Sequence, residues 1–138
     1  MNEIIYTVEN ELDSAEFIDV LKRSTLSERR PVNDLDRIKK MCANANLIVT
    51  ARIDGKLIGI ARSVTDFVYC NYLSDLAVDI QFQKQGVGKK LIEETKKQTP
   101  QATLILLSAP AAIEYYPKIG MTKHNHCFIL KDSDDLKI

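Results

Sequence analysis

Residues 83–88 read QKQGVG, a glycine-containing turn between two segments of different periodicity. Residues 72–78 before it predict a strand, and the amphipathic stretch that begins near Gly86 predicts a helix. Glycine lets a backbone approach a ligand closely, and the free N–H groups and dipole of a helix N-terminus favour negative charge. The turn therefore predicts an α/β fold that holds a phosphorylated ligand.

The glycine spacing excludes two common phosphate-binding turns. A P-loop places four residues between its glycines and continues with Lys-Ser/Thr, whereas Gly86 and Gly88 are separated by a single residue. A Rossmann turn needs a third glycine, and Leu91 occupies that place. What remains is Gln-x-x-Gly-x-Gly directly after a strand.

This pattern resembles motif A of the GNAT superfamily of N-acetyltransferases, Gln/Arg-x-x-Gly-x-Gly/Ala, which also follows a strand. The resemblance implies that the turn binds the pyrophosphate of acetyl-coenzyme A. It also implies that the main chain at the end of the preceding strand pairs with the pantetheine arm and stabilises the oxyanion of the reaction. The implied cofactor-binding residues are Leu76, Ala77, Val78, Gln83, Lys84, Gln85, Gly86, Val87, Gly88 and Lys89.

Residues 112–121, AIEYYPKIGM, resemble a second family segment, Ala-x-x-Phe/Leu-Tyr-x-Lys-x-Gly-Phe. The resemblance places Tyr116 where the family has a tyrosine that acts as general acid. A phenol with a pKa near ~10 is protonated at neutral pH and can donate its proton to the thiolate that leaves the thioester. The segment departs from the family at Met121, where phenylalanine is usual. Shortly before the segment, the family often has asparagine near the position of Ala109.

The bulk properties exclude several classes of protein. The 138 residues suit one domain, predicted at 1–138, and 19 basic residues balance 19 acidic ones, so no net charge attracts nucleic acid. No apolar run is long enough to span a membrane, and no signal peptide is recognisable. The three widely spaced cysteines favour free thiols in a reducing cytoplasm.

The order of predicted elements is strand 3–9, helices 14–24 and from 35, strands 47–53, 56–64 and 68–78, helix from 86, strand 103–107, helix 110–116 and strand 123–130. Hairpin strands followed by a crossover predict a mixed sheet with helices on its faces. The family resemblance adds a mostly antiparallel central sheet in which the parallel strands near 72–78 and 103–108 splay apart.

The residues that take up the amine's proton and hold the acceptor are less constrained. Asp75 is the candidate general base, and a water chain is the alternative. Glu28, Arg29 and Tyr72 are candidate substrate contacts, and the odd spacing of Tyr72 and Asp75 predicts opposite sheet faces. Arg29, Arg30 and Arg62 can pair with acidic substrate groups or be ordinary solvated or ion-paired surface residues.

Segments 26–31, 59–66 and 72–78 are similar to small single-domain GNAT proteins related to arylalkylamine (serotonin-type) N-acetyltransferases. We therefore expect direct acetyl transfer to a small-molecule amine. The alternatives are a protein or peptide N-acetyltransferase and a noncatalytic acetyl-coenzyme A sensor. A homodimer is expected from the resemblance only, and no metal site is expected, because His124, His126 and Cys127 lack partner ligands.

Overall fold

The computed structural model describes residues 2–137, and the chain divides into two compact units, one ending at Leu107 and the other beginning at Ser108. The prediction of a single domain over 1–138 stays a prediction. The elements of the first unit are β1 (Ile4–Val8), α1 (Ser14–Arg23), the 3₁₀ turn η1 (Leu26–Arg29), α2 (Leu35–Asn44), β2 (Leu47–Ile53), β3 (Lys56–Thr65), β4 (Cys70–Val78), the 3₁₀ turn η2 (Ile80–Phe82), α3 (Val87–Gln98) and β5 (Thr103–Ile105).

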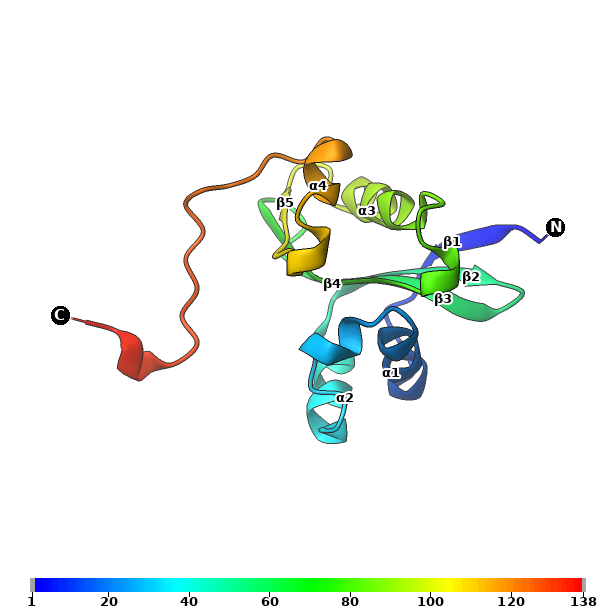
Figure 1. Cartoon of the computed structure of the whole chain (residues 1–138), viewed down its shortest axis with the longest axis horizontal. Coiled ribbons are helices and arrows are strands. Elements are labelled where there is room, and N and C mark those ends of the chain that lie inside the picture. The colour runs from blue at the N-terminus through cyan, green and yellow to red at the C-terminus, as the bar shows by residue number, and fades with distance from the viewer. Residues whose placement is uncertain (1, 138) are drawn as a thin grey trace. The chain divides into compact units, whose positions relative to one another are not determined.

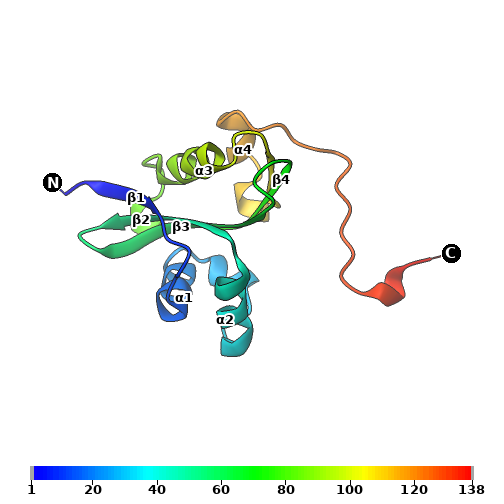
Figure 2. The same ribbon diagram turned by 180° about the vertical axis from the view of Figure 1, so that it is seen from behind.

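The strands of the first unit form one mixed sheet in the order β1-β2-β3-β4-β5. Neighbouring strands run antiparallel except β4 and β5, which are parallel. Helices α1 and α2 cover one face of the sheet and α3 covers the other (Figures 1 and 2). This architecture confirms the predicted fold class.

Each face of the sheet has its own apolar core. On one face, side chains of α1 and α2 pack on the sheet around Phe17 and Ile60, whereas on the other face α3 packs through Val87 and Leu91. The approach of α3 is close at Gly59 of β3, where a Cβ would lie 3.1 Å from a methyl group of Leu91. The small residue at 59 therefore lets the N-terminal turns of α3 lie directly on the sheet.

Local sequence signals explain where the first helices begin. The carboxylate of Asp13 accepts from the backbone N–H of Ala15, and that of Asp34 accepts from the N–H of Arg37. Each aspartate satisfies an amide that the helix itself leaves without a partner. Aspartate is a favoured residue at this position, which explains why α1 and α2 begin where they do.

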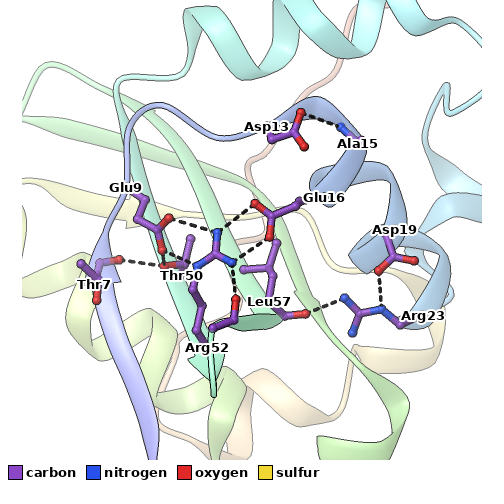
Figure 3. Close-up of polar contacts among 11 residues, drawn as sticks. Thr7, Glu9, Asp13, Ala15, Glu16, Asp19, Arg23, Thr50, Arg52 and Leu57 are labelled. Atoms are coloured by element: carbon purple, nitrogen blue, oxygen red, sulfur yellow. Dashed lines mark hydrogen bonds and ion pairs between the residues drawn. The ribbon is translucent and has the colours of Figure 1, made fainter.

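The end of the sheet at β1 and the β2–β3 hairpin is held by a network around Arg52. Its guanidinium donates to the carboxylates of Glu9, directly after β1, and Glu16 on α1 (Figure 3). It also donates to the carbonyl of Gly55 in the turn. The turn residues Asp54 and Gly55 both have positive φ, as a tight hairpin with an Asp-Gly pair requires. Arg52 thus links the residue after β1, helix α1 and the β2–β3 turn.

Strand β4 contains a bulge at Ser74. Arg62 of β3 pairs with Asp75, but the next pair is Ser63 with Leu73, so Ser74 has no partner of its own on β3. Pairing with β5 covers only residues 70–72 of β4 and ends just before the bulge. The parallel strands therefore diverge where the bulge bends β4. The strand predicted over 103–107 is formed, but it covers only Thr103–Ile105 and is partly exposed, so the expected length and burial are wrong.

The second unit contains the 3₁₀ turn η3 (Pro110–Ala112), helix α4 (Tyr115–Lys118) and the 3₁₀ turn η4 (Ser133–Asp135). Gly120 lies two residues after the end of α4 and has φ +102°, and the N–H of Met121 donates to the carbonyl of Tyr116 at 3.0 Å. Glycine after a helix adopts this left-handed conformation without strain. The Gly in the second motif therefore closes α4.

Two predictions for the second unit need correction. The helix expected over 110–116 is divided into η3 and α4, and the strand expected over 123–130 is not formed. A strand requires hydrogen bonds to a neighbouring strand, which an alternating sequence cannot supply alone. Phe128 in this segment is 91% exposed. Across residues 2–137, no helix is both long and apolar enough to cross a membrane.

Candidate active site

The predicted phosphate-binding turn connects the end of β4 to the start of α3. Gly86 has φ +84° and precedes α3, whose N-terminus has no side-chain cap. The first intrahelical bond is donated by Lys90 to the carbonyl of Gly86, so the N–H groups of Val87, Gly88 and Lys89 precede it. An uncapped helix N-terminus of this kind binds anions through its amides and dipole.

Side chains within the turn tie it to the end of β4. Gln83 donates to the carbonyl of Val78 at 2.8 Å, and Gln85 donates to the carbonyl of Gln81 at 3.3 Å. Lys84 has a positive φ of 63°, and its side chain is exposed, as is that of Lys89. Gln83, the first residue of the motif, therefore holds the turn in place. Lys84 and Lys89 lie in the same segment as the N–H groups at the start of α3.

Asp79 anchors the start of this connection, a role that the sequence did not reveal. Its carboxylate accepts from the N–H of Gln81 at 2.9 Å and from Arg23 of α1 at 2.6 Å, while its own N–H donates to Ile58 of β3. Burial acts to raise the pKa of Asp79, but these hydrogen bonds outweigh it and lower the pKa. The sequence signal that could have indicated this role is an aspartate directly after a predicted strand.

Beyond the bulge, β4 pairs with β3 and, in the described part of the chain, with no other strand. The N–H of Asp79 points toward β3, since it donates to Ile58, and main-chain groups alternate in direction along a strand. The N–H groups of Leu76 and Val78 therefore point to the open edge. This edge lies next to the turn that Gln83 fastens to Val78.

The structure places Asp75 in a different environment from the one expected of a base. Asp75 is 0% exposed, and its two carboxylate oxygens accept from Arg30 and Arg62. Neither oxygen is left to face a substrate amine. The assignment of the base stays a prediction, and this placement favours the water-chain alternative.

The expectation that Tyr72 and Asp75 face opposite sides of the sheet is wrong. Tyr72 pairs with Val64, and Asp75 pairs with Arg62, two residues earlier on β3. Residues two apart on a regular strand share a face, as do directly paired residues. The bulge at Ser74 therefore puts Tyr72 and Asp75 on the same face.

The remaining candidates lie in both units. Glu28 and Arg29 are exposed in η1, and Tyr72 is exposed on β4. Tyr116 lies in α4 of the second unit, where its ring meets that of Tyr115 edge-on at 5.3 Å. Burial raises the pKa of Tyr116 above its ordinary value of 10.0, with a smaller contribution from Tyr115. The raised pKa keeps this hydroxyl protonated across the physiological range.

Residues 17–131 match the family model of the acetyltransferase (GNAT) domain. The chain belongs to the GNAT family. It is 28% identical over 96 residues to an uncharacterized N-acetyltransferase, ycf52, of Pyropia yezoensis, covering 64% of this chain and 55% of the relative. It is 34% identical over 68 residues to histone acetyltransferase TAP1 of Glycine max, covering 47% and 29%. The chain thus spans about half, or less, of the length of these relatives.

The fold also matches solved GNAT structures. Aminoglycoside N-acetyltransferase AAC(6')-Iy, in complex with CoA, superposes with a TM-score of 0.73 and 15% identity over 96% of this chain and 97% of the other. At this identity the likeness shows the fold alone. The prediction of a GNAT protein from the motif at 83–88 is confirmed, whereas the serotonin-type subgroup stays a prediction.

Proposed function

We propose that this chain is an acetyl-coenzyme A-dependent N-acetyltransferase that transfers acetyl directly to the primary amine of a small molecule. The observation that carries the proposal is the juxtaposition, within one unit, of an uncapped helix N-terminus and an open strand edge. The first suits a pyrophosphate, and the second suits the amide-containing pantetheine arm.

The residues present fit this cofactor. The amides of Val87, Gly88 and Lys89 are available to phosphate oxygens, Lys84 and Lys89 add positive charge, and the edge of β4 offers main-chain hydrogen bonds. Acetyl-coenzyme A would supply an acetyl group already activated as a thioester. The open N–H groups of β4 would favour negative charge on the acetyl oxygen during transfer. Tyr116 is the proposed proton donor to sulfur, on the family resemblance and its raised pKa.

An apolar row on the sheet supports a small-molecule acceptor. Val64, Tyr72 and Ile105 are direct cross-strand neighbours on β3, β4 and β5, and all are exposed. The row reaches the point where β4 and β5 diverge. A basic protein segment would instead be favoured by acidic side chains there, so the row supports an amine with an apolar body.

The test is the release of free thiol from acetyl-coenzyme A in the presence of arylalkylamines, polyamines, amino acids, aminosugars or lysine peptides. We expect turnover with one class of small amine. Turnover with lysine peptides alone would indicate the protein-acetylating alternative. Binding of the cofactor without turnover on any amine would favour a noncatalytic sensor, and absence of binding would overturn the proposed site.

Gly86→Ala is expected to weaken coenzyme A binding by about tenfold, a loss of ~1.4 kcal/mol. The added Cβ disfavours φ +84° and stands beside the amides that face phosphate. Isothermal titration with coenzyme A measures the change. Gly55→Ala is the matched control, because Gly55 has φ +82° and equally open surroundings in the distant hairpin. Equal affinities of the two variants would contradict the role of Gly86.

The homodimer and the cytoplasmic location are also proposals. Sedimentation of the purified chain tests the first, and localisation of a tagged chain tests the second. Among residues 2–137, no three histidine, cysteine or acidic side chains are grouped so that they could hold a metal ion.

A further inference from the structure

Buried Asp75, buried Arg62 and the partly exposed Arg30 form a charged cluster beside the bulge of β4. Both arginines donate through Nε to the carboxylate of Asp75. Arg62 also donates to the carbonyl of Met41 in α2 at 3.1 Å and lies 6.0 Å from the centre of the Phe17 ring of α1. The cluster is therefore fixed to both helices on this face of the sheet.

The same two arginines hold the bulge residue itself. Arg30 Nη2 donates to the carbonyl of Ser74 at 2.8 Å, and Arg62 Nη2 donates to the hydroxyl of Ser74 at 3.1 Å. Ser74 has no partner on β3, so these bonds take the place of the missing ladder contacts. A planar guanidinium suits this task, because its N–H groups can donate to the carboxylate of Asp75 and to the neighbouring backbone carbonyl at the same time.

We propose that Arg30, Arg62 and Asp75 are positioning residues that fix the bulge of β4, so that Leu76 and Val78 present their N–H groups to the pantetheine arm. The inference rests on the proposed function. Asp75 in this role holds the two arginines and takes no proton from the amine. The cluster also fastens the end of η1 to β4, because Arg30 directly follows η1.

The arrangement of the sheet explains why the bulge has to be held in place. Beyond Tyr72, β4 is not paired with β5, and a bulge both bends a strand and increases its twist. The direction of the open N–H groups therefore depends on what holds Ser74 and Asp75. A fully satisfied buried polar network gives one defined geometry.

Arg30→Lys tests the proposal, because lysine keeps the charge but cannot make the forked contact with Asp75 and Ser74. Coenzyme A and adenosine 3′,5′-bisphosphate, which lacks the pantetheine arm, are titrated into the wild type and the variant. We expect the affinity for coenzyme A to fall by about tenfold, the effect of losing one or two hydrogen bonds, while that for the bisphosphate stays unchanged. The ratio of the two dissociation constants is the decisive quantity.

Arg52→Lys is the matched control. Arg52 also lies between two carboxylates and a carbonyl (Figure 3), and its side chain is 21% exposed against 20% for Arg30. Its network is at the β1 end of the sheet, so Arg52→Lys should leave the ratio unchanged. A simple loss of folded protein would weaken both ligands equally.

An unchanged ratio in Arg30→Lys, with or without a lower melting temperature, would overturn the positioning role. The same ratio change in Arg52→Lys would overturn it as well. Failure of the wild type to bind either ligand would refute the proposed cofactor site, which is a different outcome.

Discussion

Replacing Asp75 with alanine is expected to lower the free energy of unfolding by about 3–5 kcal/mol. The substitution leaves Arg30 and Arg62 next to each other without the carboxylate that balances their charges. Arg62 is 8% exposed at its side chain, so bulk water has little access to the guanidinium that loses its partner. Because small domains are stable by only about 5–15 kcal/mol, this loss is large.

Urea unfolding measures the effect of Asp75→Ala. Asp36→Ala serves as the control, since Asp36 forms an exposed ion pair with Lys40 and should contribute at most about 0.5 kcal/mol. A double-variant cycle with Arg62→Ala separates the coupling between the two residues from the effect of each change alone. A loss below about 1 kcal/mol in Asp75→Ala would show that the cluster is not a buried ion network of the expected kind.

Tyr116→Phe is expected to lower kcat by about 10²–10⁴-fold, the range for loss of a general acid. The affinity for acetyl-coenzyme A should stay unchanged, because phenylalanine keeps the ring. Tyr115→Phe, which removes the neighbouring hydroxyl, should keep kcat within about twofold of the wild type. Steady-state kinetics with the amine identified by the panel give both values.

The raised pKa of Tyr116 also determines the expected pH dependence. A general acid acts in its protonated form, so kcat should remain high as pH rises and fall only above the ordinary tyrosine pKa of about 10. The alkaline fall should be absent in Tyr116→Phe. Full activity of Tyr116→Phe, or an alkaline limb that persists in it, would exclude Tyr116 as the acid.

The sequence predicted those parts of the fold that depend on local signals. Asp34 begins α2 through its own side chain, and the Asp-Gly pair closes the β2–β3 hairpin within a few residues. The glycine turn at 83–88 was also predictable, because the glycine at 86 and the helix after it are adjacent in the chain. Its match to the family motif was enough to identify the family.

The predictions that were wrong depend on contacts between residues that are far apart in the sequence. A periodic pattern cannot show that Ser74 is a bulge, and one extra residue reverses the face on which Tyr72 lies relative to Asp75. The pairing of Asp75 with Arg30 joins residues 45 positions apart, and neither residue type reveals its partner. The strand expected over 123–130 failed for the same reason, since its apolar residues do not specify an edge.

The parallel pairing of β4 with β5 has a consequence for the order in which the protein folds. Strands β2, β3 and β4 form a meander of sequential neighbours, whereas β5 can join β4 only after α3 has crossed the sheet. A crossover closes a longer loop than a hairpin does, so its entropic cost is larger and it forms more slowly. We therefore expect the meander to gain protection from hydrogen exchange first. A chain still emerging from a ribosome would then have most of its sheet before α3 completed the turn that we propose binds coenzyme A.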